Sequence, residues 1–110
     1  MNRTDRQLFL EGITLFNRGR YYECHDVMEH LWGHGDDELR NLYKGILHIA
    51  VALYHFRNHN LKGAVSLLES GIGLVGEYST FTAGVDIPLL VSHAGTLLQR
   101  IRKGHVESCR

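Results

Sequence analysis

Residues 42–56 read LYKGILHIAVALYHF, and this stretch decides the fold class. Its apolar side chains cover most of the circumference of a helix, as they do in the central, most buried helix of a domain. We expect that helix to run from about Glu38 to Asn58. The chain contains one proline and shows no convincing alternating strand pattern, so the helical prediction extends to the whole sequence.

Four further helices are expected around this one. Their predicted ranges are about Asp5–Asn17, Tyr21–Trp32, Leu61–Tyr78 and Asp86–Lys103. Thr4 and Gln7 make a capping-box signature at the first start, and Asp86 followed by Pro88 marks the last one. A loop is expected at residues 79–85. The predicted fold class is therefore all-α: a single-domain antiparallel helical bundle of about five helices over residues 1–110.

The composition is that of an ordinary globular protein, with 44% apolar residues and 12 basic residues balanced by 12 acidic ones. A net charge of zero gives no long-range attraction to nucleic acid or to an anionic membrane, so neither is expected as a partner. No uncharged apolar run approaches the about 18–20 residues of a membrane span. Cys24 and Cys109 form no paired spacing and the N-terminus shows no signal-peptide pattern, so we expect a reduced, cytoplasmic location.

The most densely polar stretch is Gly19–Trp32, which reads GRYYECHDVMEHLW. On a helical wheel with about 100° per residue, its polar residues separate into two groups. His25 and Glu29 lie one turn apart at the border of the apolar arc. The residues on the far side of the wheel are Glu23, Asp26 and His30.

A polar stripe also runs along the central helix, and its members are Asn41, Lys44, His48 and His55. If a short connection joins the two helices into an antiparallel hairpin, positions whose numbers sum to about 73 lie at the same level. His25 then lies level with His48, and Glu29 lies level with Lys44. The geometry therefore predicts one polar seam built from residues that are distant in the sequence.

Three interpretations of this seam stay open. His25, Glu29 and His48 could ligate a divalent metal, but Lys44 is an unfavourable neighbour for a cation and the metal is not favoured. His25 could instead act as a catalytic base oriented by Glu29. In the third interpretation, Glu29 and Lys44 form an ion pair between the helices, and His25 is a hydrogen-bonded residue at the border of the core.

Other chemically capable side chains have structural interpretations. Cys24 lies on the apolar arc and is expected to be a buried, unreactive thiol. The tyrosines expected at the edge of the core are Tyr21, Tyr22, Tyr43 and Tyr54. The histidines expected in solvent are His30, His34, His59, His93 and His105. The candidates for ligand or partner binding are Glu23, Trp32, Lys44, His48, Tyr54 and His55.

Two blocks of the sequence, FNRGRYYECHDVMEHLW (residues 16–32) and KGILHIAVALYHFRNHNLKGAVSLLESGIGLV (residues 44–75), match a known family in order and spacing. Together they resemble the small helical family catalogued as domain of unknown function 309, over roughly Leu8 to Val75. The resemblance implies that the family pattern includes Gly19, Glu23, His25, Glu29 and Trp32 in the first block, and Gly45, Ala50, Tyr54, His55, Asn60, Gly63 and Ala64 in the second. It implies no particular activity.

The chain departs from the family pattern at two positions, where Lys44 and His48 replace the expected glutamines. Amides at these positions suit a hydrogen-bonding seam better than a metal site. We therefore expect a small helical binding or interaction module, self-associating as a homo-oligomer, whose seam recognises a small polar ligand or a partner. The alternative is a hydrolase-type enzyme that uses His25 and Glu29, with or without a divalent metal.

Overall fold

The computed structural model describes residues 1–104, which contain five α-helices, one 3₁₀ turn and a two-stranded hairpin. In chain order these are α1 (Arg3–Asn17), α2 (Tyr21–His34), η1 (Asp37–Leu39), α3 (Arg40–Arg57), α4 (Leu61–Val75), β1 (Phe81–Thr82), β2 (Val85–Asp86) and α5 (Ile87–Arg102). The predicted all-α class with about five helices is confirmed. None of the helices in this range is both long and apolar enough to cross a membrane. The predictions for His105 and Cys109 lie outside the described residues.

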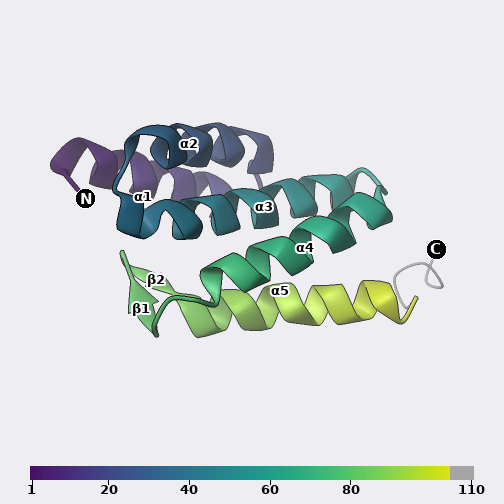
Figure 1. Cartoon of the computed structure of the whole chain (residues 1–110). Coiled ribbons are helices and arrows are strands. Elements are labelled where there is room, and N and C mark those ends of the chain that lie inside the picture. The colour runs from purple at the N-terminus through teal and green to yellow at the C-terminus, as the bar shows by residue number, and fades with distance from the viewer. Residues whose placement is uncertain (105–110) are drawn as a thin grey trace.

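The helices form a layered arrangement with α3 at its centre (Figure 1). α3 packs against α2 on one side and against α4 on the other, while α1 covers α2 and α5 covers α4. As predicted, α3 contributes more buried residues than any other helix of residues 1–104. These residues are Leu42, Tyr43, Gly45, Ile46, Ile49, Ala50 and Ala52.

Two glycines bring α3 and α4 close together. A Cβ atom added to Gly45 would lie 2.5 Å from Val75 Cγ1 and 3.1 Å from the carbonyl oxygen of Gly71. A Cβ atom added to Gly71 would lie 2.6 Å from Ile49 Cγ1 and 2.9 Å from the carbonyl oxygen of Gly45. Each glycine therefore faces the backbone of the other helix. A glycine within a helix costs about 1 kcal/mol of stability relative to alanine, and the close packing of α3 on α4 offsets this cost.

A tyrosine that follows α4 in the chain forms hydrogen bonds with the backbone at the start of α3. Tyr78 Oη donates a hydrogen bond to the carbonyl oxygen of Glu38 at 2.8 Å and accepts one from the amide of Leu42 at 3.0 Å. Leu39, the N-cap residue of α3, makes no side-chain cap. The Tyr78 hydroxyl therefore supplies a partner for one of the amides that a helix leaves unpaired in its first turn.

Three predicted boundaries are wrong. α1 is capped by Asn2, whose Oδ1 accepts from the amide of Asp5 at 2.7 Å, and not by Thr4. The first residues of the predicted central helix form the separate η1 turn. α4 ends at Val75 and not at Tyr78, whose hydroxyl binds the backbone at the start of α3.

A short antiparallel hairpin occupies part of the predicted loop at residues 79–85. Its turn is made by Ala83 and Gly84, both with positive φ, at 53° and 83°. Each strand has two residues, which is too short for an alternating pattern to show in the sequence. The predicted N-cap of the last helix is confirmed, since Asp86 Oδ1 accepts from the amide of Leu89 at 3.1 Å.

Tyr43 is fully buried in the core, and the prediction that it lies at the core edge is wrong. Its ring centre lies 5.7 Å from that of Phe9, and its hydroxyl has no hydrogen-bond partner within residues 1–104. Burial and then the nearby Asp36 and Asp5 carboxylates raise the pKa of Tyr43 to about 12.

We expect Tyr43→Phe to raise the free energy of unfolding by up to about 1 kcal/mol, because it removes a buried polar atom without removing a hydrogen bond. Urea unfolding measures the change. Tyr22→Phe is a control at an exposed position and is expected to change stability by less than about 0.5 kcal/mol. A loss of more than about 1 kcal/mol in Tyr43→Phe would show that the hydroxyl makes a stabilising hydrogen bond.

Candidate binding site between α2 and α3

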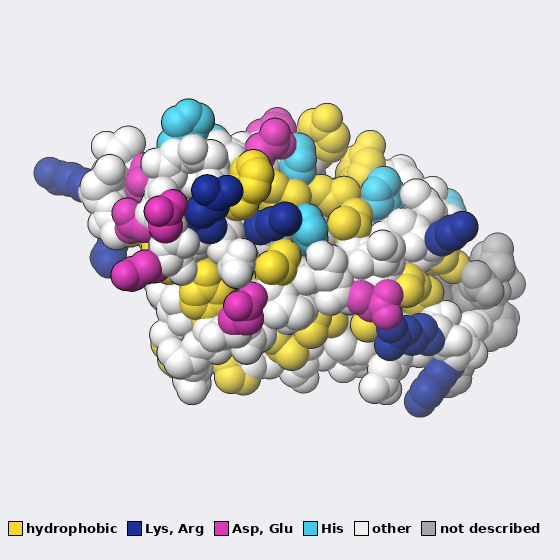
Figure 2. All heavy atoms as spheres, in the orientation of Figure 1, with side chains coloured by type: hydrophobic (Ala, Val, Ile, Leu, Met, Phe, Trp, Pro, Cys, Tyr) yellow, Lys and Arg dark blue, Asp and Glu magenta, His cyan; other side chains and the backbone are white. Residues whose placement is uncertain are grey.

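A small pocket opens between α2 and α3, on the face where Figure 2 shows histidine, acidic and basic side chains beside apolar ones. The pocket has a volume of about 230 Å³, and we call it the seam pocket. It is lined by His25, Glu29, Trp32, Lys44, Leu47 and His48. The predicted antiparallel register placed His25 level with His48 and Glu29 level with Lys44, and all four residues line this pocket.

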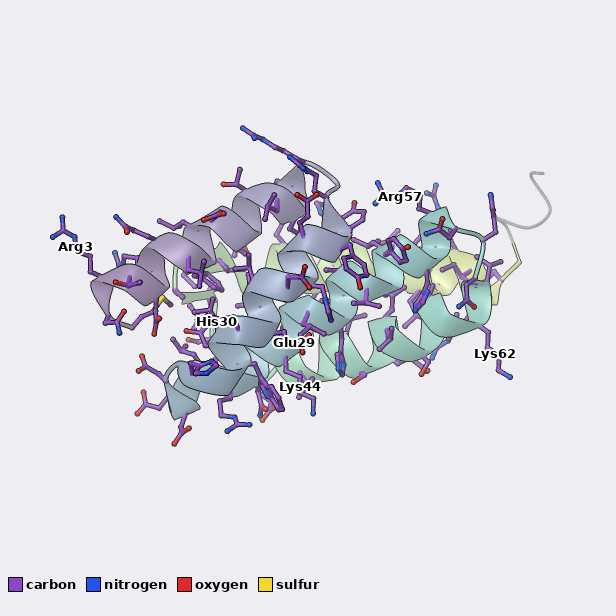
Figure 3. All side chains as sticks on the ribbon, turned by 90° about the horizontal axis from the view of Figure 1, so that it is seen from above. Arg3, Glu29, His30, Lys44, Arg57 and Lys62 are labelled. Carbon is purple, nitrogen blue, oxygen red and sulfur yellow. The ribbon has the colours of Figure 1, made fainter. Side chains whose placement is uncertain are left out.

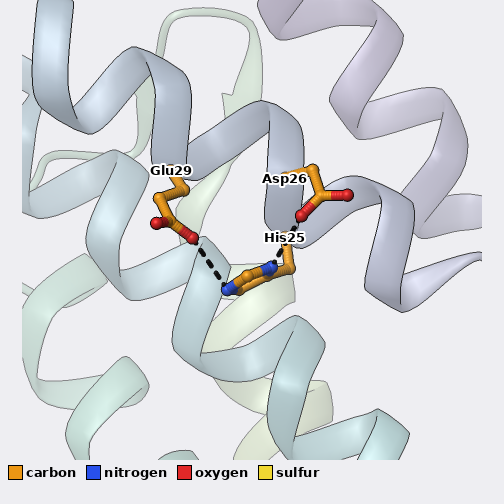
Figure 4. Close-up of polar contacts among 3 residues, drawn as sticks. All are labelled: His25, Asp26 and Glu29. Atoms are coloured by element: carbon orange, nitrogen blue, oxygen red, sulfur yellow. Dashed lines mark hydrogen bonds and ion pairs between the residues drawn. The ribbon is translucent and has the colours of Figure 1, made fainter.

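His25 is held between two carboxylates of its own helix (Figure 4). Its Nδ1 lies 3.2 Å from Asp26 Oδ1, and its Nε2 lies 3.1 Å from Glu29 Oε2. An ionised carboxylate only accepts hydrogen bonds, so both contacts are hydrogen bonds at the same time only when the ring carries two protons. The helical wheel placed Asp26 away from His25, which is wrong for the side chain because a wheel does not show how a carboxylate turns.

Lys44 faces Trp32 and not Glu29, although Lys44 and Glu29 lie near each other at the seam (Figure 3). Its Nζ lies 5.9 Å from the centre of the Trp32 ring, and the guanidinium carbon of Arg40 lies 4.8 Å from the same ring. No carboxylate of residues 1–104 lies within 4.0 Å of the Lys44 ammonium. The predicted Glu29–Lys44 ion pair is therefore absent from this part of the chain, because Glu29 contacts His25 and Lys44 lies over an aromatic ring.

His48 connects the seam pocket to α4, where its Nδ1 lies 2.7 Å from Ser70 Oγ. Burial and then the nearby Lys44 ammonium lower the pKa of His48, because both disfavour a charged ring. His48 therefore presents a neutral imidazole near pH 7. Ser70 was not among the predicted site residues, although the turn at residues 58–60 pairs positions whose numbers sum to about 118 and so puts His48 level with Ser70.

The described residues do not bring three metal ligands together. Within residues 1–104, no group of three or more His, Cys, Asp and Glu side chains could hold a metal ion. The ring nitrogens of His25 face carboxylates, and Nδ1 of His48 faces a hydroxyl. The donor set as placed does not fit a divalent metal, and ligation by His25, Glu29 and His48 stays a prediction.

Tyr54 and His55 lie farther along α3, outside the lining of the seam pocket. The ring of Tyr22 lies between Tyr54 and the seam pocket. The centre of the Tyr22 ring is 5.7 Å from that of Tyr54 and 5.6 Å from that of His25. The rings of Tyr54 and His55 are 6.0 Å apart, and His55 Nδ1 lies 3.4 Å from Asn60 Nδ2. A row of aromatic side chains therefore extends from the seam pocket along α3. Tyr22 was not among the predicted binding residues.

Several polar residues of α2 lie outside the seam pocket. Glu23 forms an exposed ion pair with Arg20, with a nitrogen–oxygen distance of 2.6 Å. Cys24 is buried as predicted, and burial raises the pKa of its thiol to about 12, which makes it unreactive. His30 and His34 are exposed as predicted, with ring centres 4.7 Å apart.

Comparison with known proteins identifies a family and two relatives that this sequence resembles. The family described as domain of unknown function (DUF309) matches residues 9–67, which include all six lining residues of the seam pocket. The chain is 38% identical over 69 residues to YpuF of Bacillus subtilis (strain 168), described as uncharacterized, covering 61% of this chain and 40% of that protein. It is 25% identical over 69 residues to an uncharacterized protein of Aquifex aeolicus (strain VF5), covering 62% of this chain and 21% of that protein. The chain spans less than half the length of either relative.

Proposed function

The chain belongs to the family described as domain of unknown function (DUF309), and we propose its function from the residues that line the seam pocket. All of these residues lie within the stretch that the family matches. We propose that the protein is a small helical binding module. Its ligand is a small polar molecule with an anionic group, bound between α2 and α3.

The proposal rests on Lys44. Its ammonium lines the seam pocket and has no carboxylate of residues 1–104 within 4.0 Å. Its positive charge contributes to the lowered pKa of His48, so its electrostatic effect extends across the pocket. Arg40 adds a second cation against the same Trp32 ring. An anionic ligand group would supply the charge-assisted hydrogen bond that no carboxylate of residues 1–104 gives to Lys44.

The other lining residues restrict the ligand further. Glu29 contacts His25 through Oε2, and a carboxylate has capacity to accept another hydrogen bond from a ligand N–H or O–H. Trp32 supplies an apolar wall. The volume of about 230 Å³ is below the range of about 300–1,000 Å³ for drug-sized ligands, so a molecule of few heavy atoms fits best.

Phosphate, acetate and glutarate are suitable probes for this pocket. We expect at least one of them to shift the backbone amide resonances of Glu29, Lys44 and His48 in an NMR titration of the full chain. Lys44→Gln is expected to weaken that anion's binding about tenfold, since a hydrogen bond to a charged group contributes about 1.5–3 kcal/mol.

Lys62→Gln is the matched control, because Lys62 lies at the start of α4, away from the seam pocket (Figure 3). This variant makes the same chemical change and is expected to keep the wild-type affinity. The proposal is contradicted if no anion shifts the resonances of the pocket. It is also contradicted if both lysine variants lose affinity equally.

The hydrolase-type alternative also stays a prediction. Both ring nitrogens of His25 contact carboxylates of α2, so in this arrangement neither nitrogen faces a substrate proton. Self-association and a cytoplasmic location also stay predictions. Light scattering of the full chain measures self-association.

A further inference from the structure

A second pocket lies on the other side of α3, between α1 and α5, and we call it the α1–α5 pocket. It has a volume of about 280 Å³. Its apolar lining consists of Ile13, Phe16, Ile46, Val85, Leu89 and Leu90. Ile46 lies about 200° around α3 from both Lys44 and His48, so the α1–α5 pocket and the seam pocket lie on opposite faces of that helix.

One carboxylate determines the charge of this pocket. Among the described residues that line it, Asp86 carries the only carboxylate, no lysine or arginine is present, and the other polar side chains are Asn17 and His93. Asp86 Oδ1 accepts from the amide of Leu89 at 3.1 Å, which fixes the carboxylate at the start of α5. No basic group in residues 1–104 lies within 4.0 Å of this carboxylate. The α1–α5 pocket therefore combines an apolar wall with a carboxylate that forms no ion pair with a basic side chain of residues 1–104.

We propose that the α1–α5 pocket binds a small organic amine. The ammonium group contacts Asp86, and a short apolar chain or a single ring fills the space between α1 and α5. A neutral molecule of the same shape leaves Asp86 without a counter-ion, and a carboxylate is repelled by it. The volume of about 280 Å³ limits the apolar part to one ring or a short chain. This site is separate from the seam pocket and prefers ligands of the opposite charge.

Three probes of similar shape test this charge preference: phenethylamine, phenethyl alcohol and phenylacetate, each titrated against the full chain by NMR. We expect the backbone amides of Ile13, Ile46 and Leu90 to shift. The amine is expected to bind with a Kd about fivefold lower than that of the alcohol, and the acid is expected to bind most weakly. The proposal is overturned if the alcohol binds as tightly as the amine, or if no probe shifts these amides.

Asp86→Asn removes the negative charge and keeps the helix cap, because asparagine caps a helix about as well as aspartate does. This variant is expected to remove the amine's advantage over the alcohol and to leave the affinity for the alcohol unchanged. Leu89→Lys places a competing ammonium at the rim, where Leu89 is 52% exposed, and is expected to remove the same advantage.

Leu10→Lys is the matched control for Leu89→Lys, since Leu10 is 54% exposed on α1 and does not line the α1–α5 pocket. It is expected to keep the wild-type preference for the amine. A preference that persists in Asp86→Asn, or that is lost in Leu10→Lys as well, overturns the assignment to this pocket. Lys44→Gln is expected to leave amine binding unchanged, so the outcome here is independent of the outcome at the seam pocket.

Discussion

Gly71→Ala is expected to lower the free energy of unfolding by about 2–3 kcal/mol, although alanine is the better helix former. The added methyl group would lie 2.6 Å from Ile49 Cγ1 and 2.9 Å from the carbonyl oxygen of Gly45. A backbone oxygen cannot rotate away as a side chain can, so α3 and α4 would have to move apart. That movement would loosen the packing of the central helix. Urea unfolding followed by circular dichroism measures the loss.

Gly73→Ala provides a control on the same helix. A Cβ atom at Gly73 would meet no atom of residues 1–104 within 4 Å. Only the gain in helix propensity then remains, and stability is expected to rise by up to about 1 kcal/mol. The two substitutions are therefore expected to have opposite signs. If Gly71→Ala stabilises the protein as Gly73→Ala does, the close approach of α3 and α4 is not rigid and the prediction fails.

Tyr78→Phe is expected to lower the free energy of unfolding by about 1–3 kcal/mol. It removes the hydroxyl that accepts from the amide of Leu42 and donates to the carbonyl oxygen of Glu38. Leu42 is buried, so its amide has little access to replacement water. Hydrogen exchange is expected to accelerate at the Leu42 amide and to change little at Ile49, in the middle of α3.

Tyr43→Phe removes the same atom from a site where it has no hydrogen-bond partner in residues 1–104. The comparison separates hydrogen bonding from ring packing, because both variants keep an aromatic ring. Equal destabilisation in the two variants would contradict the role given to the Tyr78 hydroxyl. Unchanged exchange at Leu42 in Tyr78→Phe would contradict it independently.

The helices could be predicted from the sequence because helical periodicity is a local property. The burial of α3 followed from apolar side chains around most of its circumference, and the cap of α5 followed from Asp86 and Pro88. The start of α3 could not be predicted, because it depends on Tyr78, which is distant in the sequence. The hairpin was missed because strands of two residues are too short to show a period.

The position of the seam pocket could be predicted as far as helix geometry extends. Because both helices rise by about 1.5 Å per residue, a short connection was enough to place His25 near His48 and Glu29 near Lys44. The pairing of positions in the α2–α3 hairpin does not determine which neighbour each side chain contacts. Lys44 has an aromatic face and a carboxylate within the same pocket, and it lies over Trp32. That choice depends on side-chain geometry, which a helical wheel does not contain.

The stretch that matches the family, residues 9–67, ends inside α4. The close packing of α3 on α4 and the closed first turn of α3 both require later residues, Gly71 and Tyr78. A polypeptide cut at residue 67 would expose the α3 side chains that the rest of α4 covers. It would also lack the Tyr78 hydroxyl, which hydrogen-bonds the backbone at the start of α3. The segment that the family match covers and the segment that completes the packing around α3 therefore end at different places in this chain.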